Sequence, residues 1–423
     1  MKKFDCPLSG ECYYRFTTKA GYPVTVIPKF GYSKIYAMFG TRYGSMDTGC
    51  VPIDGSPAFH IPDGTAHFLE HKLFEGESED AFTRYARTGA NANAYTSSDK
   101  TVYLFSCTER FEESFGILLD FVTHPYFTTE TVAKEQGIIG QEIKMYDDDP
   151  EWRVLMNVMQ AMFHNNPARI DTAGTVESIA QITPEILYHC YNTFYNPANM
   201  GIVVCGDVDP IQVQLLCERY LPMRQTAQVK RPLTEEPDGV QTKRVVEKHA
   251  VAKPQFLIGY KDPQASTGEQ AAKKEAMSEI IMDMLFGHSS DFYGELYQSG
   301  LINNNFSTGF YGGHGFGASL LGGESENPDT VYDRIQQTIN QAVVQGLDES
   351  GFQRSKNKIY GDYMRRLNSV ENTASVFIDL DFIGVDFSDF MRIYQDISIE
   401  DCNMWLVSHY TDAHCTLSIV EPQ

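Results

Sequence analysis

The chain has 423 residues, 42% of them hydrophobic, which is enough for one large or two ordinary domains with complete cores. Acidic residues outnumber basic ones by 56 to 34, so the formal net charge is -22 at pH 7. A nucleic-acid-binding protein needs a basic surface, and this balance argues against that class. An acidic surface could attract basic peptides, but solubility alone accounts for it equally well.

The first residues, MKKFDCPLSGECYYRF, contain two lysines but no apolar run of signal-peptide length. No uncharged apolar segment elsewhere is long enough to span a bilayer. Nine cysteines are scattered along the chain without a C-x-x-C pair, so neither a disulfide framework nor a thiolate zinc finger is indicated. We therefore expect a cytoplasmic protein with no membrane span.

Hydrophobic periodicity divides the first hundred residues into strands and one helical region. Alternating segments predict strands at 22–29 and 33–46, and helical periodicity then runs from about Gly64 to Thr88. Two more strands are predicted in NANAYTSS (91–98) and TVYLFSC (101–107). The order indicates a mixed α/β arrangement for this part of the chain.

A long helical region is predicted from about Arg110 to Asn196, followed by an apolar strand in NMGIVVCGDV (199–208). An amphipathic helix then continues to about Leu221. The next segment, from Pro222 to Lys243, is polar, holds three prolines and lacks hydrophobic periodicity. These properties are typical of a linker.

The composition change predicts three regions of the chain. Residues 1–222 would form an N-terminal half, residues 223–243 a linker, and residues 244–423 a C-terminal half.

The segment GTAHFLEHKLFEG (64–76) contains two histidines four residues apart with a glutamate between them. Residues at this spacing share one helix face, so His67 and His71 could both present a ring nitrogen to one metal ion. A catalytic zinc site uses three protein ligands and an open position for water, and a carboxylate such as Glu70 can move the proton of that water. An H-x-x-E-H pattern is expected only about 0.02 times by chance in a random chain of this length. We interpret it as a zinc site with its own general base, rather than as polar positions on an ordinary helix.

The third ligand is expected in AKEQGIIGQEIKMYDDDPEWR (133–153). Glu135 and Glu142 are two helical turns apart and share one face of the predicted helix. One could bind zinc while the other accepts a hydrogen bond from a ligating histidine. Spacing alone does not choose between them. The three aspartates before Pro150 indicate a solvated helix end.

Three stretches of the second half match the first half in the same order, which predicts an internal duplication. HFLEHKLFEG aligns with EIIMDMLFGH, TGANANAYT with SGLINNNFS, and FYNPANMGIVVC with HYTDAHCTLSIV. In this alignment Glu279, Met282 and Asp283 replace the two histidines and the glutamate of the motif. The chain would therefore carry one site.

H-x-x-E-H followed by KEQGIIGQEI resembles the pitrilysin, insulysin and mitochondrial processing peptidase family of inverted-motif zinc peptidases. NAYTS, GTVESI and FYNPANMGIVVCGDVDP extend the similarity, and DCPLSGE and GIIGQEIKMYDDDPEWRV are closer still to bacterial YmfH-type members. The resemblance implies an α+β protein built from two tandem homologous α/β halves, of the LuxS and processing-peptidase metallohydrolase type, that enclose a chamber. It implies a zinc endopeptidase acting on extended or unfolded peptides.

The resemblance also assigns roles to residues that spacing left open. It implies that Glu142 is the third zinc ligand and that Glu135 is the supporting acid of the catalytic site. It further implies a sheet edge beside the zinc, to which an extended substrate adds as another strand. The candidate substrate-binding residues are Asn93, Ala94, Tyr95 and Thr96, and the alternative for these four is an ordinary strand against which helices pack.

One departure from the family pattern concerns the grip on the substrate carbonyl. Active members supply an Arg and a Tyr from the second half, whereas LYQSGLINN here has Tyr297 and Asn303 at those positions. A donor of this kind can contribute a few kcal/mol to transition-state stabilisation. We therefore expect a heterodimer with a homologous chain that lacks H-x-x-E-H and supplies the Arg/Tyr pair.

Two alternatives compete with the peptidase. A non-catalytic scaffold subunit of the same fold has no physical need for Glu70 beside intact ligands. Enzymes of the S-ribosylhomocysteine lyase type also carry H-x-x-E-H, but they are far shorter and lack the helical segment with Glu135 and Glu142.

The glycine-rich segment STGFYGGHGFGASLLGG (307–323) could be mistaken for a phosphate-binding loop. It lacks the G-K-[ST] ending and does not fit G-x-G-x-x-G between a strand and a helix. We predict twisted or bulged strands there.

Overall fold

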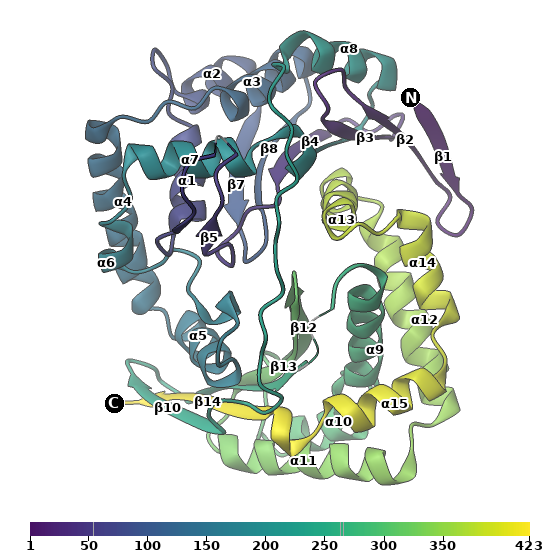
Figure 1. Cartoon of the computed structure of the whole chain (residues 1–423). Coiled ribbons are helices and arrows are strands. Elements are labelled where there is room, and N and C mark those ends of the chain that lie inside the picture. The colour runs from purple at the N-terminus through teal and green to yellow at the C-terminus, as the bar shows by residue number, and fades with distance from the viewer. Residues whose placement is uncertain (54, 263, 265) are drawn as a thin grey trace. The chain divides into compact units, whose positions relative to one another are not determined.

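The computed structural model describes residues 1–53, 55–262, 264 and 266–423 (Figure 1). The chain forms two compact units, each composed of several chain segments. The first unit contains residues 1–143, 171–232 and 364–388, and the second contains residues 144–170, 233–363 and 389–423. Both units combine one main sheet with helices, so the predicted α+β class is confirmed.

The main sheet of the first unit has seven strands in the order β1-β2-β3-β9-β4-β8-β7. β3 and β9 are parallel, and the other neighbouring pairs are antiparallel. All residues of β9 are buried, as expected for a continuous apolar run at the centre of a sheet. The strands of this unit are β1 (Lys2–Cys6), β2 (Glu11–Thr17), β3 (Pro23–Pro28), β4 (Ile35–Thr41), β7 (Asn91–Thr96), β8 (Thr101–Cys107) and β9 (Met200–Gly206), with a separate short pair, β5 (Gly49–Cys50) and β6 (Phe59–His60).

The helices of the first unit surround the hydrophobic core of that sheet. Helix α4 carries both candidate glutamates and continues into the second unit. The helices are α1 (Thr65–Leu73), α2 (Ala81–Thr88), α3 (Phe111–Thr123), α4 (Thr129–Asp147), α6 (Val176–Ile179), α7 (Pro184–Phe194), α8 (Pro210–Tyr220) and α13 (Val370–Ile383).

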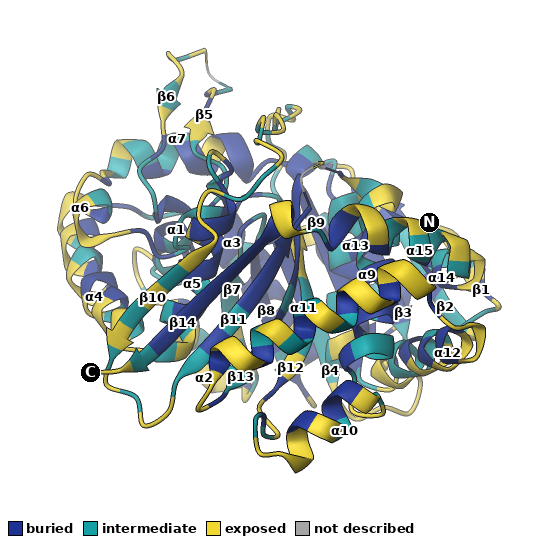
Figure 2. Cartoon of the chain, turned by 90° about the horizontal axis from the view of Figure 1, so that it is seen from below, coloured by how far each residue is buried: buried dark blue, intermediate teal, exposed yellow. Residues whose placement is uncertain are grey.

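The sheet of the second unit has five strands in the order β10-β14-β11-β13-β12. Its buried centre and the half-exposed outer helix α11 are visible in Figure 2. The strands are β10 (Arg244–His249), β11 (Gln255–Lys261), β12 (Ser307–Gly313), β13 (Phe316–Glu324) and β14 (Cys415–Pro422). The helices that belong mainly to this unit are α5 (Pro150–Met162), α9 (Gly268–Phe286), α10 (Asp291–Gln298), α11 (Pro328–Gln345), α12 (Glu349–Arg366), α14 (Phe387–Asp396) and α15 (Ile399–His409).

The two sheets share one topology. β10 pairs with β14 in parallel and the remaining pairs are antiparallel, so the order β10-β14-β11-β13-β12 reproduces β3-β9-β4-β8-β7. The predicted duplication is therefore confirmed. The glycine-rich segment forms β12 and β13, as predicted, and does not form a phosphate-binding loop.

The structure corrects one detail of the internal alignment. Gly89 and Gly300, both with a φ of 74°, follow the ends of α2 and α10 and correspond as predicted. β7 begins at Asn91, however, whereas β12 begins only at Ser307, because the second connection is longer. Asn304 therefore lies in a turn before the strand, not on it.

Each sheet is covered by one helix from the other half of the sequence, as the halves were predicted. Helix α13 packs on β9 and β4, and α5 packs on β14 and β11. Glycines permit the close approach: a Cβ at Gly40 would lie 2.9 Å from the Phe382 ring of α13, and a Cβ at Gly259 would lie 2.8 Å from Met162 of α5. The compact units thus contain different chain segments from the two predicted halves. The predicted boundaries at residues 222 and 243 stay a prediction of where one repeat ends and the next begins.

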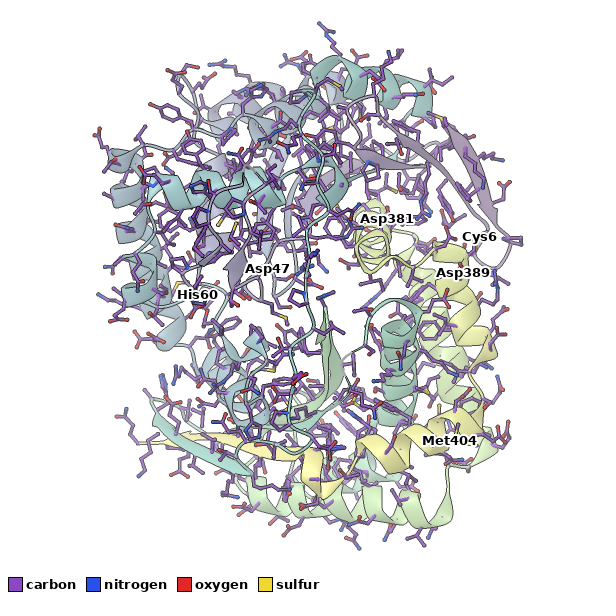
Figure 3. All side chains as sticks on the ribbon, viewed as in Figure 1. Cys6, Asp47, His60, Asp381, Asp389 and Met404 are labelled. Atoms are coloured by element: carbon purple, nitrogen blue, oxygen red, sulfur yellow. The ribbon has the colours of Figure 1, made fainter. Side chains whose placement is uncertain are left out.

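Partly buried polar contacts hold α13 on the first sheet. Asp381, labelled in Figure 3, accepts hydrogen bonds from Arg15 at 2.5 Å and from Thr25 at 2.9 Å. Arg42 donates to the main-chain oxygens of Asp381 and Phe382 at the end of the same helix. Charged groups so placed need partners, and these contacts supply them.

The segment 223–243, all of which the structure describes, contains no helix or strand. It is nevertheless fixed within each unit. Arg231 donates to both carboxylate oxygens of Asp47, at 2.8 and 3.0 Å, in the first unit. Glu236 accepts main-chain hydrogen bonds from His164 and Asn166 in the second. The segment is therefore an ordered, extended connection.

Candidate metal centre

The predicted helical region from Gly64 to Thr88 is two helices, α1 and α2, separated by residues 74–80. Gly76 lies in this break, where a Cβ would be 2.4 Å from the Glu79 oxygen. Asp80 then caps α2 by accepting a hydrogen bond from the Thr83 amide at 2.8 Å. The region is therefore helical, as predicted, but it is divided at a turn that helical periodicity does not reveal.

The N-terminus of α1 is fixed by contact between two backbones. Gly64 has a φ of 88°, and a Cβ there would lie 2.4 Å from the Ala173 oxygen. Conversely, a Cβ at Gly174 would lie 2.5 Å from the Asp63 oxygen, which also accepts a hydrogen bond from Ser178 at 2.8 Å. Only glycine fits at both positions, so the first turn of α1 is tied to the segment that leads into α6.

The Gly64 contact gives a first testable prediction. Gly64→Ala is expected to lower the free energy of unfolding by more than about 1–2 kcal/mol, because the left-handed conformation alone costs that much and the new Cβ also collides with Ala173. Gly137→Ala on α4 is the matched control, since a Cβ there meets nothing within 4 Å. That variant should raise the free energy of unfolding by up to about 1 kcal/mol. Denaturant unfolding checks both, and equal changes in the two variants would contradict this account.

Helix α1 places its two histidines together. Phe68, Leu69 and Leu73 are buried on the side of α1 that packs toward β7 and β8. The imidazole rings of His67 and His71 lie on another face, with their centroids 4.6 Å apart. The four-residue spacing therefore produces the side-by-side rings that a shared ion requires.

Helix α4 brings Glu142 to both rings. Its Oε1 lies 3.7 Å from Nε2 of His67, and its Oε2 lies 3.6 Å from Nε2 of His71. Donor atoms of a tetrahedral zinc ion with bonds near 2.1 Å lie about 3.3–3.5 Å apart. The three side chains thus have the donor types of a zinc site, and their donor atoms all lie within 4.8 Å of one another. Within the described residues, this is the one group of three His, Cys, Asp or Glu side chains close enough to hold a metal ion.

Glu135 lies behind His71 and does not face both rings. Its buried carboxylate oxygen Oε1 is 2.9 Å from Nδ1 of His71, while Nε2 of the same ring faces Glu142. A carboxylate in this position fixes the ring orientation and the tautomer of a ligating histidine. The fold therefore distinguishes the two glutamates that spacing left equivalent.

The two histidines respond differently to their surroundings. Burial, and the nearby His71, lower the pKa of His67 to about 4. Burial also acts to lower the pKa of His71, but its hydrogen bond to Glu135 and the neighbouring carboxylates raise that pKa overall. His67 is consequently neutral at pH 7, the protonation state that metal binding requires.

Glu70 is buried beside this group and hydrogen-bonds to strand β7. The Thr96 hydroxyl donates to Oε2 of Glu70 at 2.6 Å. Burial raises the pKa of the Glu70 carboxyl, and the Thr96 hydrogen bond partly opposes this. A carboxylate with a raised pKa is a stronger base than one in water.

Strand β7 carries the four candidate substrate-binding residues at the edge of the first sheet. It pairs with β8 on one side, and among the described residues no strand pairs with its other side. Asn93 is exposed and its Oδ1 accepts a hydrogen bond from the Ala94 amide at 2.9 Å. Ala94, Tyr95 and Thr96 are half-buried. β7 is thus a sheet edge that packs against α1, the helix that carries His67 and His71.

The second unit has ordinary contacts at the aligned positions. Glu279 accepts a hydrogen bond from the Tyr394 hydroxyl at 2.8 Å, Met282 is buried, and Asp283 forms an ion pair with Lys358. These side chains stabilise the packing of α9. They do not gather as the corresponding side chains of α1 do.

The positions at which an Arg and a Tyr were expected are also visible in the second unit. Tyr297 is 46% exposed and its ring stacks on Tyr293, with centroids 5.7 Å apart. The Asn303 amide donates to Glu324 at 2.8 Å. The first position therefore holds a phenol instead of a guanidinium, and the second holds an amide instead of a phenol.

Comparison with known proteins gives the family. The model described as "Insulinase (Peptidase family M16)" matches residues 61–176, and "Peptidase M16 inactive domain" matches residues 181–359. YmfH of Bacillus subtilis (strain 168), named an uncharacterized zinc protease, is 39% identical over 95% of this chain and 94% of its own length. The chain belongs to peptidase family M16. The resemblance derived from the sequence is therefore confirmed.

Other M16 proteins agree in fold and in part of the sequence. A crystal structure named as an M16-like peptidase from Alicyclobacillus acidocaldarius superposes with a TM-score of 0.95 and 34% identity, covering 99% of this chain and 100% of that one. The mitochondrial-processing peptidase subunit beta of Caenorhabditis elegans is 31% identical over 37% of this chain and 36% of its own length. The model that matches residues 181–359 is that of an inactive domain, consistent with one candidate metal-binding group among the residues that the structure describes.

Sequence reasoning missed two contacts that position the site. Thr96 was predicted only as a substrate-strand residue, and nothing in a separation of 26 residues indicates its hydrogen bond to Glu70. Gln136, between the turns that carry Glu135 and Glu142, donates to the oxygens of Ile179 and Ile182, both at 3.1 Å. These bonds tie α4 to the α6 segment that also holds the start of α1. No helix in the described part of this M16 chain has the length and hydropathy to cross a membrane.

Proposed function

We propose that this M16 chain is a zinc-dependent endopeptidase that hydrolyses extended or unfolded peptides. The observation that carries the proposal is the placement of Glu142 within 3.7 Å of both histidine Nε2 atoms. Glu70 is buried on α1, the helix that carries the two histidines. The names of the relatives support a zinc protease, and the donor set in this chain suits that ion.

The residues that would hold zinc are His67, His71 and Glu142. Two imidazoles and one carboxylate leave a tetrahedral position open. When bound, zinc supplies Lewis-acid chemistry, acidifying water and polarising a carbonyl group. Glu135 would keep Nδ1 of His71 protonated and Nε2 free to bind.

Glu70 would serve as the general base and acid. One carboxylate oxygen, Oε2, is engaged by Thr96, which leaves Oε1 to accept a proton from the attacking water. The same carboxyl would then deliver that proton to the amide nitrogen of the leaving group. Burial, which raises the pKa of Glu70, makes its carboxylate a stronger base for the first of these transfers.

Strand β7 would bind the substrate as an added strand. An edge strand offers main-chain donors and acceptors at alternate residues, and here the segment runs from Asn91 to Thr96. Such pairing selects for an extended backbone rather than for a particular side chain. Asn93, Ala94 and Tyr95 are the residues expected to line the bound peptide.

We further propose that the chain works as one half of a heterodimer. Tyr297 and Asn303 occupy the positions at which the resemblance implies an Arg and a Tyr that grip the substrate carbonyl. The Tyr297 ring stacks on Tyr293, and the Asn303 amide donates to Glu324. A homologous chain without H-x-x-E-H could supply that pair. A second copy of this chain could not, since it has the same two residues.

The partner requirement predicts that the isolated chain folds and holds zinc but cleaves peptides slowly. Adding the homologous partner should raise kcat/KM, because stabilisation of the transition state is completed only in the complex. The measurement is kcat/KM of the purified chain with and without a co-purified partner. Full activity of the chain alone, unchanged by the partner, would contradict the heterodimer.

The second candidate function is a non-catalytic scaffold subunit. It is favoured by the inactive-domain model that matches residues 181–359 and by Tyr297 and Asn303. Metal analysis combined with a peptide-library digest separates the two functions. A scaffold would cleave no peptide even with zinc and a partner present. The proposed peptidase would bind zinc and cleave peptides from the library.

A further inference from the structure

We infer that Thr96 is a positioning residue that holds the Glu70 carboxylate in its working orientation. The inference rests on the proposed peptidase function. Its basis is the 2.6 Å hydrogen bond from Oγ1 of Thr96 to Oε2 of Glu70. Thr96 would then act on the reaction through Glu70, not by touching the substrate with its side chain.

The hydrogen-bond network indicates where the Thr96 proton goes. The other polar neighbour of Thr96 is the Thr101 hydroxyl, at the longer distance of 3.3 Å. Thr101 gives its own proton to the main-chain oxygen of Tyr43, at 2.8 Å. Hydrogen bonds to a carboxylate are shorter and stronger than those between neutral groups. The Thr96 proton is therefore donated to Glu70.

Glu70 depends on this bond for its orientation. Its main chain is fixed in α1, but three side-chain torsions separate the carboxylate from the backbone. Across the described residues, Thr96 is the one side chain that forms a hydrogen bond with the Glu70 carboxylate. The carboxylate is also buried, where an unpaired oxygen is costly. Without the Thr96 hydroxyl, Oε2 would lose its partner and the carboxylate would be free to rotate.

Thr96 is well suited to this task. It lies at the end of β7, whose register with β8 is fixed, including the pair of Thr96 with Thr101. A β-branched side chain in a strand has restricted χ1 rotation, so the hydroxyl direction is defined. The strand proposed to receive the substrate thus also orients the general base. Serine has the same hydroxyl with more rotational freedom, whereas valine has the same shape without it.

The test compares Thr96→Val and Thr96→Ser in the full chain with its partner. Thr96→Val is expected to lower kcat about 10–100-fold, the usual cost of removing a residue that orients a catalytic group, with KM and zinc content unchanged. Thr96→Ser should stay within a few-fold of the wild type. Thr101→Val is the matched control: it removes the adjacent buried hydroxyl and should lower the melting temperature while leaving kcat unchanged.

A second readout does not depend on turnover. A high-resolution crystal structure of Thr96→Val should show the Glu70 carboxylate in a new or mixed rotamer, with α1 unmoved. If Thr96→Val does not fold, Thr96→Ala provides the same comparison. Equal kcat in Thr96→Val and the wild type would overturn the inference. So would a raised KM at unchanged kcat, which would make Thr96 a substrate contact instead.

The inference and the proposed function can fail separately. A wild-type chain that holds no zinc and cleaves no peptide with its partner would overturn the proposed function, and the inference with it. A wild-type chain that cleaves peptides, together with a fully active Thr96→Val variant, would overturn the positioning role alone.

Discussion

Replacing Glu70 by Gln is expected to abolish peptide cleavage and to leave zinc binding intact. The amide keeps the size of the side chain and can still accept a hydrogen bond from Thr96, but it cannot take up a proton from water. General acid–base catalysis contributes about 10²–10⁴-fold, so kcat should fall by at least that factor. Because Glu70 is not among the three side chains grouped around one ion position, zinc content should stay near one ion per chain.

The experiment measures zinc per chain and kcat on the same preparation, with the partner present. Glu77→Gln is the matched control, since Glu77 is an exposed glutamate in the break between α1 and α2. That variant should resemble the wild type in both measurements. Undiminished cleavage by Glu70→Gln would show that another group moves the proton, and would contradict the mechanism.

Glu142→Gln is expected to weaken zinc binding much more than Glu135→Gln. Glu142 faces Nε2 of both histidines, so the substitution removes the negative charge of the proposed third ligand. Glu135 contacts only Nδ1 of His71, and the loss of such a supporting contact typically costs 10–100-fold in affinity or activity. The difference should appear as a larger zinc dissociation constant for the Glu142 variant.

Competition with a chelator of known affinity gives the two dissociation constants. Glu130→Gln, at the exposed start of the same helix, controls for changes in the charge of α4 and should bind zinc like the wild type. Circular dichroism of the metal-free variants checks that each still folds. Equal or reversed losses for Glu135→Gln and Glu142→Gln would mean that the two roles have been assigned wrongly.

The sequence predicted the elements that position the site more accurately than the contacts between them. The run NMGIVVCGDV is buried along its full length as β9, because a central strand needs apolar residues on both faces. NANAYTSS forms edge strand β7. Three short alignments predicted the duplication, and the structure shows that it comprises five strands in each sheet. The exchange of α5 and α13 was not predicted, because periodicity identifies a helix but does not identify the sheet on which it packs.

The same distinction holds within the site. A four-residue spacing on a helix fixes how His67 and His71 lie, so the pair could be predicted from the sequence alone. Glu135 and Glu142 share a face of α4, and only the packing of α4 against α1 shows which one reaches both rings. The bond between Thr96 and Glu70 joins a strand to a helix, and no spacing rule covers such a pair.

The claim that His67, His71 and Glu142 hold a zinc ion used for peptide hydrolysis is tested most directly by titration. Zinc is removed with a chelator and returned in known amounts, while bound zinc and cleavage of a quenched peptide library are measured in one sample containing the partner. The cleavage rate is expected to rise in proportion to bound zinc and to saturate at one ion per chain. Cleavage that persists without zinc, or a fully loaded complex that cleaves no peptide, would contradict it.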